Sequence, residues 1–447
     1  MKILKNKKEI SAFLNLLRKR ALGVSPEIEK AVKSILFDVR KNGDSAVEKY
    51  TRRFDKHDLP LRLKASDIAK RAKKADKKIV KALELSAKRI WDFHERQREK
   101  SWSFKKDGAL LGQIIRPIER AGVYVPGGKA SYPSTVLMNV IPAQVAGVKN
   151  ICLCVPTPIG ETNPYVMAAI EMLGVKEICR IGGAQAVGAM AYGTESIKKV
   201  DKIVGPGNIY VALAKKMVFG EVDIDMIAGP SEILIIADET ANPKFVAADM
   251  LSQAEHDELA SSILITDSEV LAGNVIQELN IQLKGLKRKD IAKKSLKRFG
   301  AIIKTKSIKE AADIANEIAP EHLELMTLQP EKDMEMIKNA GAVFSGQWTP
   351  EPLGDYSAGP NHTLPTGGTA RFSSPLGVYD FIKRTSLLQF DKKGFMLLSD
   401  TVEAIADVEG LEAHANTIRI RKKSALRPPY AKGVNYKEFS LTRKQVL

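Results

Sequence analysis

The stretch SEILIIADETANPKFVAADMLSQAEHDELASSILIT, residues 231–266, decides the fold class. Both of its ends are short apolar runs rich in β-branched residues, which predict buried strands. Between them, Asn242 and Pro243 predict the start of a helix, because asparagine caps free backbone N–H groups and proline is tolerated at the first helical position. A strand, a helix and a second strand in this order predict a parallel sheet covered by helices.

The same alternation of strand and helix occurs over two stretches of the chain. Four segments between residues 121 and 208 each predict a strand followed by a helix: AGVYVPGG, NICLCVP, EICRIGG and KIVGPGN. After residue 266, the runs GAIIKT and GAVFSG predict further strands. Ser307 and Glu310 predict a capping box at the start of a helix that Pro320 ends. We therefore predict two related α/β units, whose strand orders should be alike.

The two ends of the chain predict helices rather than this alternation. Near the start, one apolar stripe predicts a short helical arm: Ile10, Phe13, Leu14 and Leu17. The lysine-rich residues 69–90 predict a single amphipathic helix. From about Pro375 the alternation stops, and YDFIKRTSLLQFDKKGF with the residues after it predicts a separate helical tail.

Charge and composition exclude several classes of protein. The 447 residues include 70 basic and 53 acidic side chains, a net charge of +17. This balance would suit a nucleic-acid partner, but the basic residues are spread out and lack interleaved aromatic residues, so we expect no nucleic acid. No apolar stretch of about 20 residues occurs, so we expect no membrane span. Three cysteines allow no disulfide framework, and Cys152 and Cys154 sit in an apolar run that predicts core residues. We expect a cytoplasmic protein.

Four of the six histidines lie beside groups that could take part in chemistry. His57 and His94 lie in charged segments, so we expect both at the surface. The segment LSQAEHD places a carboxamide and an imidazole three residues apart, on one face of a helix. A lone histidine at a helix end more often has a capping or packing role, but together the segments offer a divalent cation suitable ligands from distant parts of the chain. The residues are Gln253 and His256, Glu321 and His322, Asp355 and His362, and Glu409 and His414.

Two further features leave alternatives open. Glu321 and His322 would point to opposite faces of a regular strand, so both reach one site only if the backbone turns after Pro320. Such a pair could share acid–base work, or it could lie in an exposed loop. The glycine loops GGKASYP, GGAQA, GPGN and GPSE could bind phosphate at helix starts or be plain turns, and none has the Gly-x-Gly-x-x-Gly spacing.

Taken together, these segments resemble the histidinol dehydrogenase family over roughly residues 30 to 425. The resemblance rests on many unusual motifs in order, among them RAGVYVPGGKASYPSTVLMNVIPAQVAGV, IGGAQAVGAMAYGTESI, DMLSQAEHD, APEHLEL, GDYSAGPNHTLPTGGTARF and EGLEAHANTIRIR. It implies oxidation of L-histidinol to L-histidine, the last step of histidine biosynthesis, with water, two NAD in succession and an enzyme-held aldehyde. It also implies incomplete Rossmann-like domains, one zinc ion per subunit and a homodimer with swapped elements.

The resemblance also implies roles for individual residues. His322 would remove the proton of the alcohol, and Glu321 would activate water. His362 falls in the loop of the substrate site. The implied metal ligands are Gln253, His256, Asp355 and His414. The implied substrate contacts are these four residues with Ser231, His322 and Glu409. The implied NAD contacts are Tyr124, Gln185 and Asn208.

The resemblance further implies a division into domains. We predict an N-terminal arm at 1–24, a first α/β domain at 25–122 and 232–375 with the zinc and catalytic residues, and a second, NAD-binding domain at 123–231. A tail at 376–447 would complete the site of the partner subunit. A metal-dependent hydrolase could use similar ligands without NAD, and a nucleic-acid-binding scaffold would explain the charge but not the histidine segments.

Overall fold

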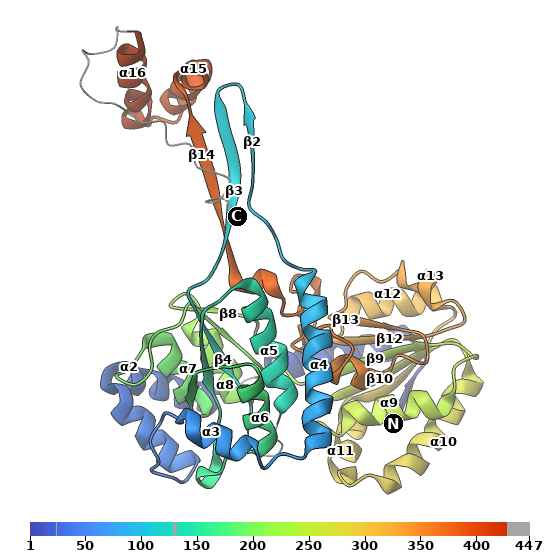
Figure 1. Ribbon diagram of the computed structural model, residues 1–447. Coiled ribbons are helices and arrows are strands. Elements are labelled where there is room, and N and C mark those ends of the chain that lie inside the picture. The colour runs from blue at the N-terminus through green and yellow to red at the C-terminus, as the bar shows by residue number, and fades with distance from the viewer. Residues whose placement is uncertain (24, 128–131, 427–447) are drawn as a thin grey trace. The chain divides into compact units, whose positions relative to one another are not determined.

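The computed structural model describes residues 1–23, 25–127 and 132–426 (Figure 1). The chain forms two compact units. The main unit comprises residues 1–97 and 118–381, and the hairpin unit comprises residues 98–117 and those from 382 onward.

The main unit holds two sheets in which every pair of neighbouring strands is parallel. The first, called here the β4 sheet, has the order β6-β5-β4-β7-β8. The second, called the β9 sheet, has the order β1-β11-β10-β9-β12-β13. The strands of the β4 sheet are β4 (Arg120–Tyr124), β5 (Asn150–Cys154), β6 (Glu177–Cys179), β7 (Lys202–Val204) and β8 (Asp223–Ile224). Those of the β9 sheet are β1 (Lys2–Leu4), β9 (Glu232–Ala237), β10 (Ser261–Thr266), β11 (Gly300–Lys304), β12 (His322–Met326) and β13 (Ala342–Ser345).

The two sheets share one strand order. Counted along the chain within each sheet, and leaving β1 aside, both read 3-2-1-4-5. It is the Rossmann strand order, 3-2-1-4-5-6, without the sixth strand. The prediction of two related parallel α/β units is therefore confirmed.

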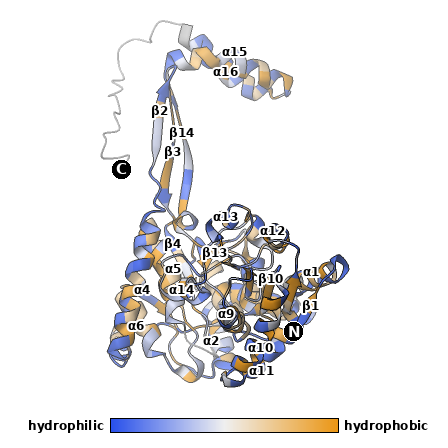
Figure 2. Cartoon of the chain, turned by 90° about the vertical axis from the view of Figure 1, so that its right-hand side faces the viewer, coloured by the Kyte–Doolittle hydropathy of each residue, from blue (hydrophilic) through white to orange (hydrophobic). Residues whose placement is uncertain are grey.

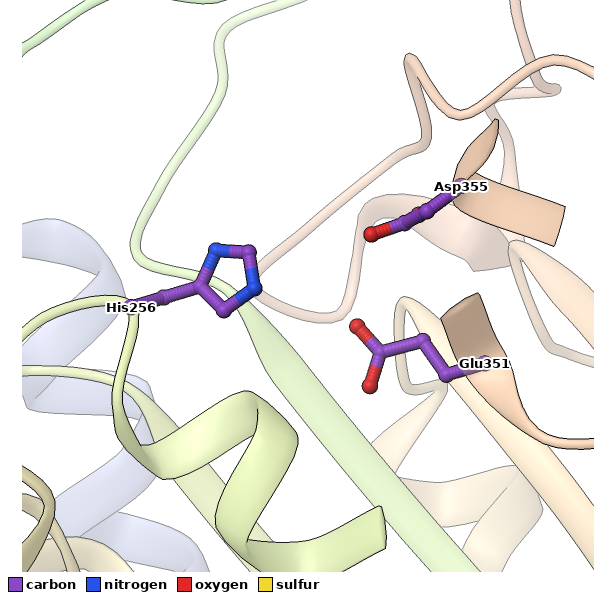
Figure 3. Close-up of side chains that lie close together, drawn as sticks. All are labelled: His256, Glu351 and Asp355. Atoms are coloured by element: carbon purple, nitrogen blue, oxygen red, sulfur yellow. The ribbon is translucent and has the colours of Figure 1, made fainter. Parts of the chain in front are cut away.

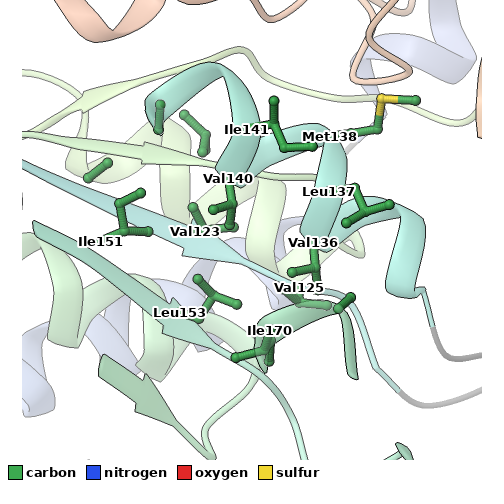
Figure 4. Packing of buried hydrophobic residues seen from close by; sticks show 14 of the residues in the cluster. Val123, Val125, Val136, Leu137, Met138, Val140, Ile141, Ile151, Leu153 and Ile170 are labelled. Atoms are coloured by element: carbon green, nitrogen blue, oxygen red, sulfur yellow. The ribbon is translucent and has the colours of Figure 1, made fainter. Parts of the chain in front are cut away.

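Helices cover both faces of the β4 sheet. One face packs against α2 (Pro26–Phe54), α7 (Gly183–Tyr192) and α8 (Ile209–Val218). The other face packs against α3 (Ala65–Ala72), α4 (Lys77–Glu95), α5 (Pro133–Ala146) and α6 (Pro164–Met172). Figure 4 shows this second core, where Val123 and Leu153 of the strands meet Val140 of α5 and Ile170 of α6. The cysteines Cys152, Cys154 and Cys179 are free and buried, so the prediction that Cys152 and Cys154 are core residues is confirmed.

The β9 sheet is covered in the same way. α9 (Pro243–Ala254), α10 (Glu269–Gly285) and α11 (Lys289–Phe299) pack on one face, and α1 (Lys7–Leu22) and α12 (Ile308–Ile318) on the other. Residues 233–237 of β9 are fully buried, as a continuous apolar run in a doubly covered parallel strand requires. The core of the main unit is largely hydrophobic, whereas its outer helices carry hydrophilic as well as hydrophobic residues (Figure 2).

The hairpin unit overturns the prediction of an entirely helical tail. β14 (Ile382–Phe390) pairs antiparallel with β3 (Ala109–Pro117), which pairs with β2 (Trp102–Lys106). Helices α15 (Lys392–Val408) and α16 (Glu412–Leu426) then follow, as predicted. The strand was missed because most of β14 is exposed, so it lacks the alternation of buried and exposed residues by which strands are recognised.

Three smaller predictions are also wrong. The chain begins with strand β1, paired with β11, before the first helix. Residues 69–90 form parts of two helices, because Asp76 caps a new helix, α4, after a turn. His94 is buried instead of exposed: it lies one turn after Ile90, on the inner face of α4, and its Nδ1 is 2.8 Å from the Ile90 carbonyl oxygen.

Among the described residues, no helix is both long and apolar enough to cross a membrane. The expected cytoplasmic location and the predicted domain boundaries stay predictions.

Candidate active site and cofactor site

The segment LSQAEHD forms the end of α9 and the turn after it. Gln253 lies in the last turn of the helix and is fully buried. Neither polar atom of its carboxamide has a hydrogen-bond partner within the described residues. His256 lies beyond the helix, which ends at Ala254, and its N–H donates to the Gln253 carbonyl at 3.2 Å. The expectation that both lie on one helix is thus corrected: the turn, not the helix, places the imidazole.

Three side chains gather where His256 projects from this turn (Figure 3). Nitrogen of His256 and carboxylate oxygens of Glu351 and Asp355 all lie within 4.8 Å of one another. Glu351 and Asp355 are four residues apart in the short helix α14 (Glu351–Tyr356), so they share one face. One imidazole and two carboxylates form a donor set that suits zinc and similar cations.

Glu351 was not expected from the sequence. It is 1% exposed, its N–H donates to Glu324 at 2.8 Å, and its Oε2 accepts a hydrogen bond from Ser252 at 3.3 Å. The i, i+4 spacing with Asp355 is the signal that could have identified it. Burial raises the pKa of Glu351 to about 7 and that of Asp249 nearby to about 6. Such a group of buried carboxylates is suited to a bound cation, which would compensate their charge.

Glu321 and His322 are brought together by the turn that the sequence suggested. α12 ends at Ile318, the next residue, Ala319, has a left-handed φ of 52°, and β12 begins only at His322. Glu321 accepts a hydrogen bond from the N–H of Glu232 at 2.8 Å, and His322 Nδ1 lies 2.9 Å from the carbonyl oxygen of the same residue. Both side chains are therefore held against the backbone of one residue of β9, with 3.7 Å between Glu321 Oε2 and His322 Nδ1.

This contact fixes the tautomer of His322. A carbonyl oxygen can only accept a hydrogen bond, so Nδ1 carries the proton and the neutral ring keeps its lone pair on Nε2. Nε2 is 3.8 Å from Asp355 Oδ1 and has no hydrogen-bond partner among the described residues. Burial lowers the pKa of His322, but the carboxylates of Glu351 and Glu321 outweigh it, and the net shift is upward. A cation bound by the carboxylates would oppose this shift and favour the neutral ring. Burial raises the pKa of Glu321 to about 8, against the effect of His322.

The remaining expected substrate residues lie in three places. Ser231 directly precedes β9 and is followed by Glu232, whose N–H and carbonyl oxygen contact Glu321 and His322. His362 Nδ1 is 3.0 Å from the carbonyl oxygen of Asp355, so it lies at the same group of side chains. Glu409, at the end of α15, and His414, in α16, belong to the hairpin unit, where both are exposed.

The residues expected to contact NAD lie at the carboxyl edge of the β4 sheet. Tyr124 ends β4, and its hydroxyl accepts a hydrogen bond from the N–H of Gly183 at 3.1 Å. Gln185 is in the first turn of α7, and its Oε1 is buried without a partner in the described part of the chain. Asn208 caps α8 by accepting hydrogen bonds from the N–H groups of Tyr210 and Val211. Residues 128–131 of the loop GGKASYP lie outside the described residues.

The two related sheets present their sites at opposite edges. Tyr124 ends β4, and Asn208 lies after the end of β7. β4 and β7 are the neighbouring strands at which the strand order of this sheet reverses, and open α/β sheets bind nucleotides at such a point. Ser231 and Glu321 precede β9 and β12, the equivalent pair in the β9 sheet, and therefore lie at the amino edge. An edge of the kind that binds nucleotides, together with an acid–base pair, is the arrangement expected of a nucleotide-dependent oxidoreductase.

Comparison with known proteins identifies the family. A family model described as histidinol dehydrogenase matches residues 18–422. The histidinol dehydrogenase of Aquifex aeolicus is 54% identical over 417 residues, covering 93% of this chain and 97% of the relative. That of Clostridium acetobutylicum is 50% identical over 415 residues, covering 92% and 96%. The crystal structure of histidinol dehydrogenase from Elizabethkingia anophelis superposes with a TM-score of 0.90 at 39% identity, covering 95% of this chain and 98% of the other. The chain belongs to the histidinol dehydrogenase family.

Proposed function

We propose that this protein oxidises L-histidinol to L-histidine in two successive steps, each reducing one NAD. The observation that carries the proposal is the geometry of His322, whose free Nε2 faces the candidate metal group while Glu321 lies 3.7 Å from its other nitrogen. Two oxidations at one carbon need a base for the alcohol proton and a group that activates water. The two residues offer both.

The proposed metal is one zinc ion per subunit, held by Gln253, His256 and Asp355 together with His414. The buried, unpartnered carboxamide of Gln253 and the ligand atoms of His256 and Asp355 support this assignment. When bound, the ion supplies a positive charge that orients the polar groups of the substrate and favours loss of the hydroxyl proton. Glu351 is a further candidate ligand, because its carboxylate lies within the same group.

In the first step His322 accepts the hydroxyl proton at Nε2 while a hydride leaves the carbinol carbon for NAD, which gives an aldehyde and NADH. In the second step Glu321 removes a proton from water as the oxygen attacks the aldehyde carbon. After His322 has released its first proton to solvent, a second hydride leaves for a second NAD, and His322 takes the remaining hydroxyl proton, so that the carboxylate forms. Ser231 and Glu409 would bind the substrate, and His362 would lie in the loop of the substrate site.

The proposed NAD contacts are Tyr124, Gln185 and Asn208. Their support is the position of all three at the carboxyl edge of the β4 sheet, where the strand order reverses. The proposed assembly is a homodimer in which His414 and Glu409 of one subunit complete the site of the other.

The test is NADH formation from a limiting amount of L-histidinol, with and without prior chelation. Two NADH per histidinol, lost on chelation and restored by zinc, is the expected result. One NADH per histidinol would show that the aldehyde is released, and the role of Glu321 would fail. No NADH from folded, zinc-loaded protein would favour a metal-dependent hydrolase instead.

A further inference from the structure

A buried ion pair joins α8 to the chain after β8. Lys215 lies two turns into α8, and Asp225 follows β8 directly. The two side chains form a salt bridge and are only 2% and 1% exposed. A pair so deeply buried has lost the solvation of both charges, and an apolar pair of similar size would often stabilise a fold as well. Stability alone therefore does not explain this ion pair, and the groups that hydrogen-bond to its two charges are more informative.

Both charges bind the same residue, Gly205. The ammonium of Lys215 donates to the Gly205 carbonyl at 2.9 Å, and the Gly205 N–H donates to Asp225 Oδ2 at 2.8 Å. Gly205 has a φ of +111°, and a Cβ atom there would lie 2.1 Å from the carbonyl oxygen of Tyr124. The residue is thus held at its N–H, at its carbonyl and by close contact with the end of β4.

Gly205 opens the Gly-Pro-Gly-Asn loop that leads to Asn208, the cap of α8. Lys215, in α8, therefore holds the loop that directly precedes the same helix. We infer that Lys215 and Asp225 are positioning residues for the nicotinamide cofactor, which hold the loop between β7 and α8 in its binding shape before NAD arrives. This inference rests on the proposed NAD site at Tyr124, Gln185 and Asn208, and it adds two buried residues that do not themselves touch the cofactor.

The test compares Lys215→Met and Asp225→Asn with the wild-type full-length enzyme. Each change removes one side of the contact with Gly205, so the loop is no longer fixed before binding. We expect KM for NAD to rise about 10-fold to 100-fold, the effect of misplacing a binding group by about 1 Å. KM for L-histidinol, and kcat at saturating NAD, should stay within about twofold, because the acid–base pair lies on the other sheet.

The matched control is Lys202→Met. Lys202 begins β7, the strand that ends just before Gly205, and its Nζ pairs with Asp223 at 2.8 Å, at the opposite end of the strand. Its side chain is 10% exposed. This variant should lower the melting temperature and leave KM for NAD unchanged, which separates positioning from general stability.

The inference is overturned if folded Lys215→Met and Asp225→Asn keep the wild-type KM for NAD while Asn208→Ala raises it. If Asn208→Ala also has no effect, the proposed NAD site itself is wrong. If the variants do not fold, the inference is tested by hydrogen exchange of residues 203–209 in the wild-type protein. Protection that is equally strong without and with NAD supports a loop fixed in advance, and rapid exchange until NAD binds contradicts it.

Discussion

Glu351 lies between the two sets of residues on which the proposed chemistry depends. Its Oε1 is 3.8 Å from His322 Nδ1, and its carboxylate also belongs to the group with His256 and Asp355. A buried carboxylate without a cation is costly, as the upward shift of its pKa to about 7 indicates. A bound divalent cation would remove this cost, so Glu351 should contribute to metal affinity.

We therefore predict that Glu351→Gln weakens zinc binding about 10-fold or more, because the amide keeps the size of the side chain and loses its charge. The measurement is a chelator competition on the full-length protein, with zinc content determined after each step. Glu324→Gln is the matched control, because Glu324 is equally buried and lies outside the group of ligand atoms. An equal loss in both variants would show that Glu351 acts only through the local backbone.

At the scale of the elements, α12 leads directly into the proposed acid–base pair, Glu321 and His322. Ser307 caps this helix by accepting a hydrogen bond from the Glu310 N–H at 3.3 Å, and Glu310 in turn accepts one from the N–H of Lys306 at 2.8 Å. The helix ends at Ile318, three residues before Glu321. We therefore expect the start of α12 to contribute to the stability of the fold and its end to position the proposed acid–base pair.

We predict that Ser307→Ala lowers the free energy of unfolding by about 1 kcal/mol, since one N–H at the helix start loses its acceptor. Urea denaturation measures this loss. KM for both substrates should not change, because the cap lies at the end of the helix away from Glu321. A change in KM with no loss of stability would contradict this division of roles.

How far the sequence predicts these elements depends on whether they are buried. β9 and β10 were predictable because parallel strands covered on both faces are continuous apolar runs. β2 and β14 were not, since nearly all their residues are exposed or partly exposed and pair only within the hairpin unit. At the site, Gln253 and His256 stood out by their motif, whereas the only sequence signal for Glu351 was its i, i+4 spacing with Asp355, and its place beside His256 depends on the packing of α14 against the turn after α9.

At the scale of the whole molecule, stability should depend on pH through Asp380. This residue lies in the last turn of the main unit before β14, where it accepts a hydrogen bond from the Gly377 N–H at 2.8 Å. Burial raises its pKa to about 6, against the effect of Lys202, whose Nζ is 3.7 Å away. Between about pH 4 and 6 the folded state then keeps a proton that the unfolded state has lost. Stability falls as pH rises through this window, and the full cost persists above it.

We predict that Asp380→Asn removes up to about 2 kcal/mol of this cost, because asparagine keeps an acceptor for Gly377 and carries no charge. Lys202 keeps Asp223 as a partner at 2.8 Å. Melting temperatures measured from about pH 4 to about pH 7 should fall less in the variant than in the wild type. Parallel curves would mean that Asp380 is ionised in the folded protein throughout.

The assembly of the proposed active site can be tested by mixing inactive subunits. Glu321 belongs to the main unit and His414 to the hairpin unit. If each site combines the main unit of one subunit with the hairpin unit of its partner, a mixed dimer of Glu321→Gln and His414→Asn carries both defects in one site. Its other site is then intact. Random exchange should restore about a quarter of wild-type activity, since about half of the dimers are mixed and half of their sites work.

The control is a mixture of Glu321→Gln with Gln253→Ala, two defects in the main unit. Every site of that mixture contains a defective main unit, so it should stay inactive whether or not sites are shared. Recovery in the first mixture alone would establish that the hairpin unit acts in the partner's site. If mass spectrometry shows mixed dimers and the first mixture stays inactive, each chain must use its own His414, and the hairpin unit would serve the main unit of the same subunit.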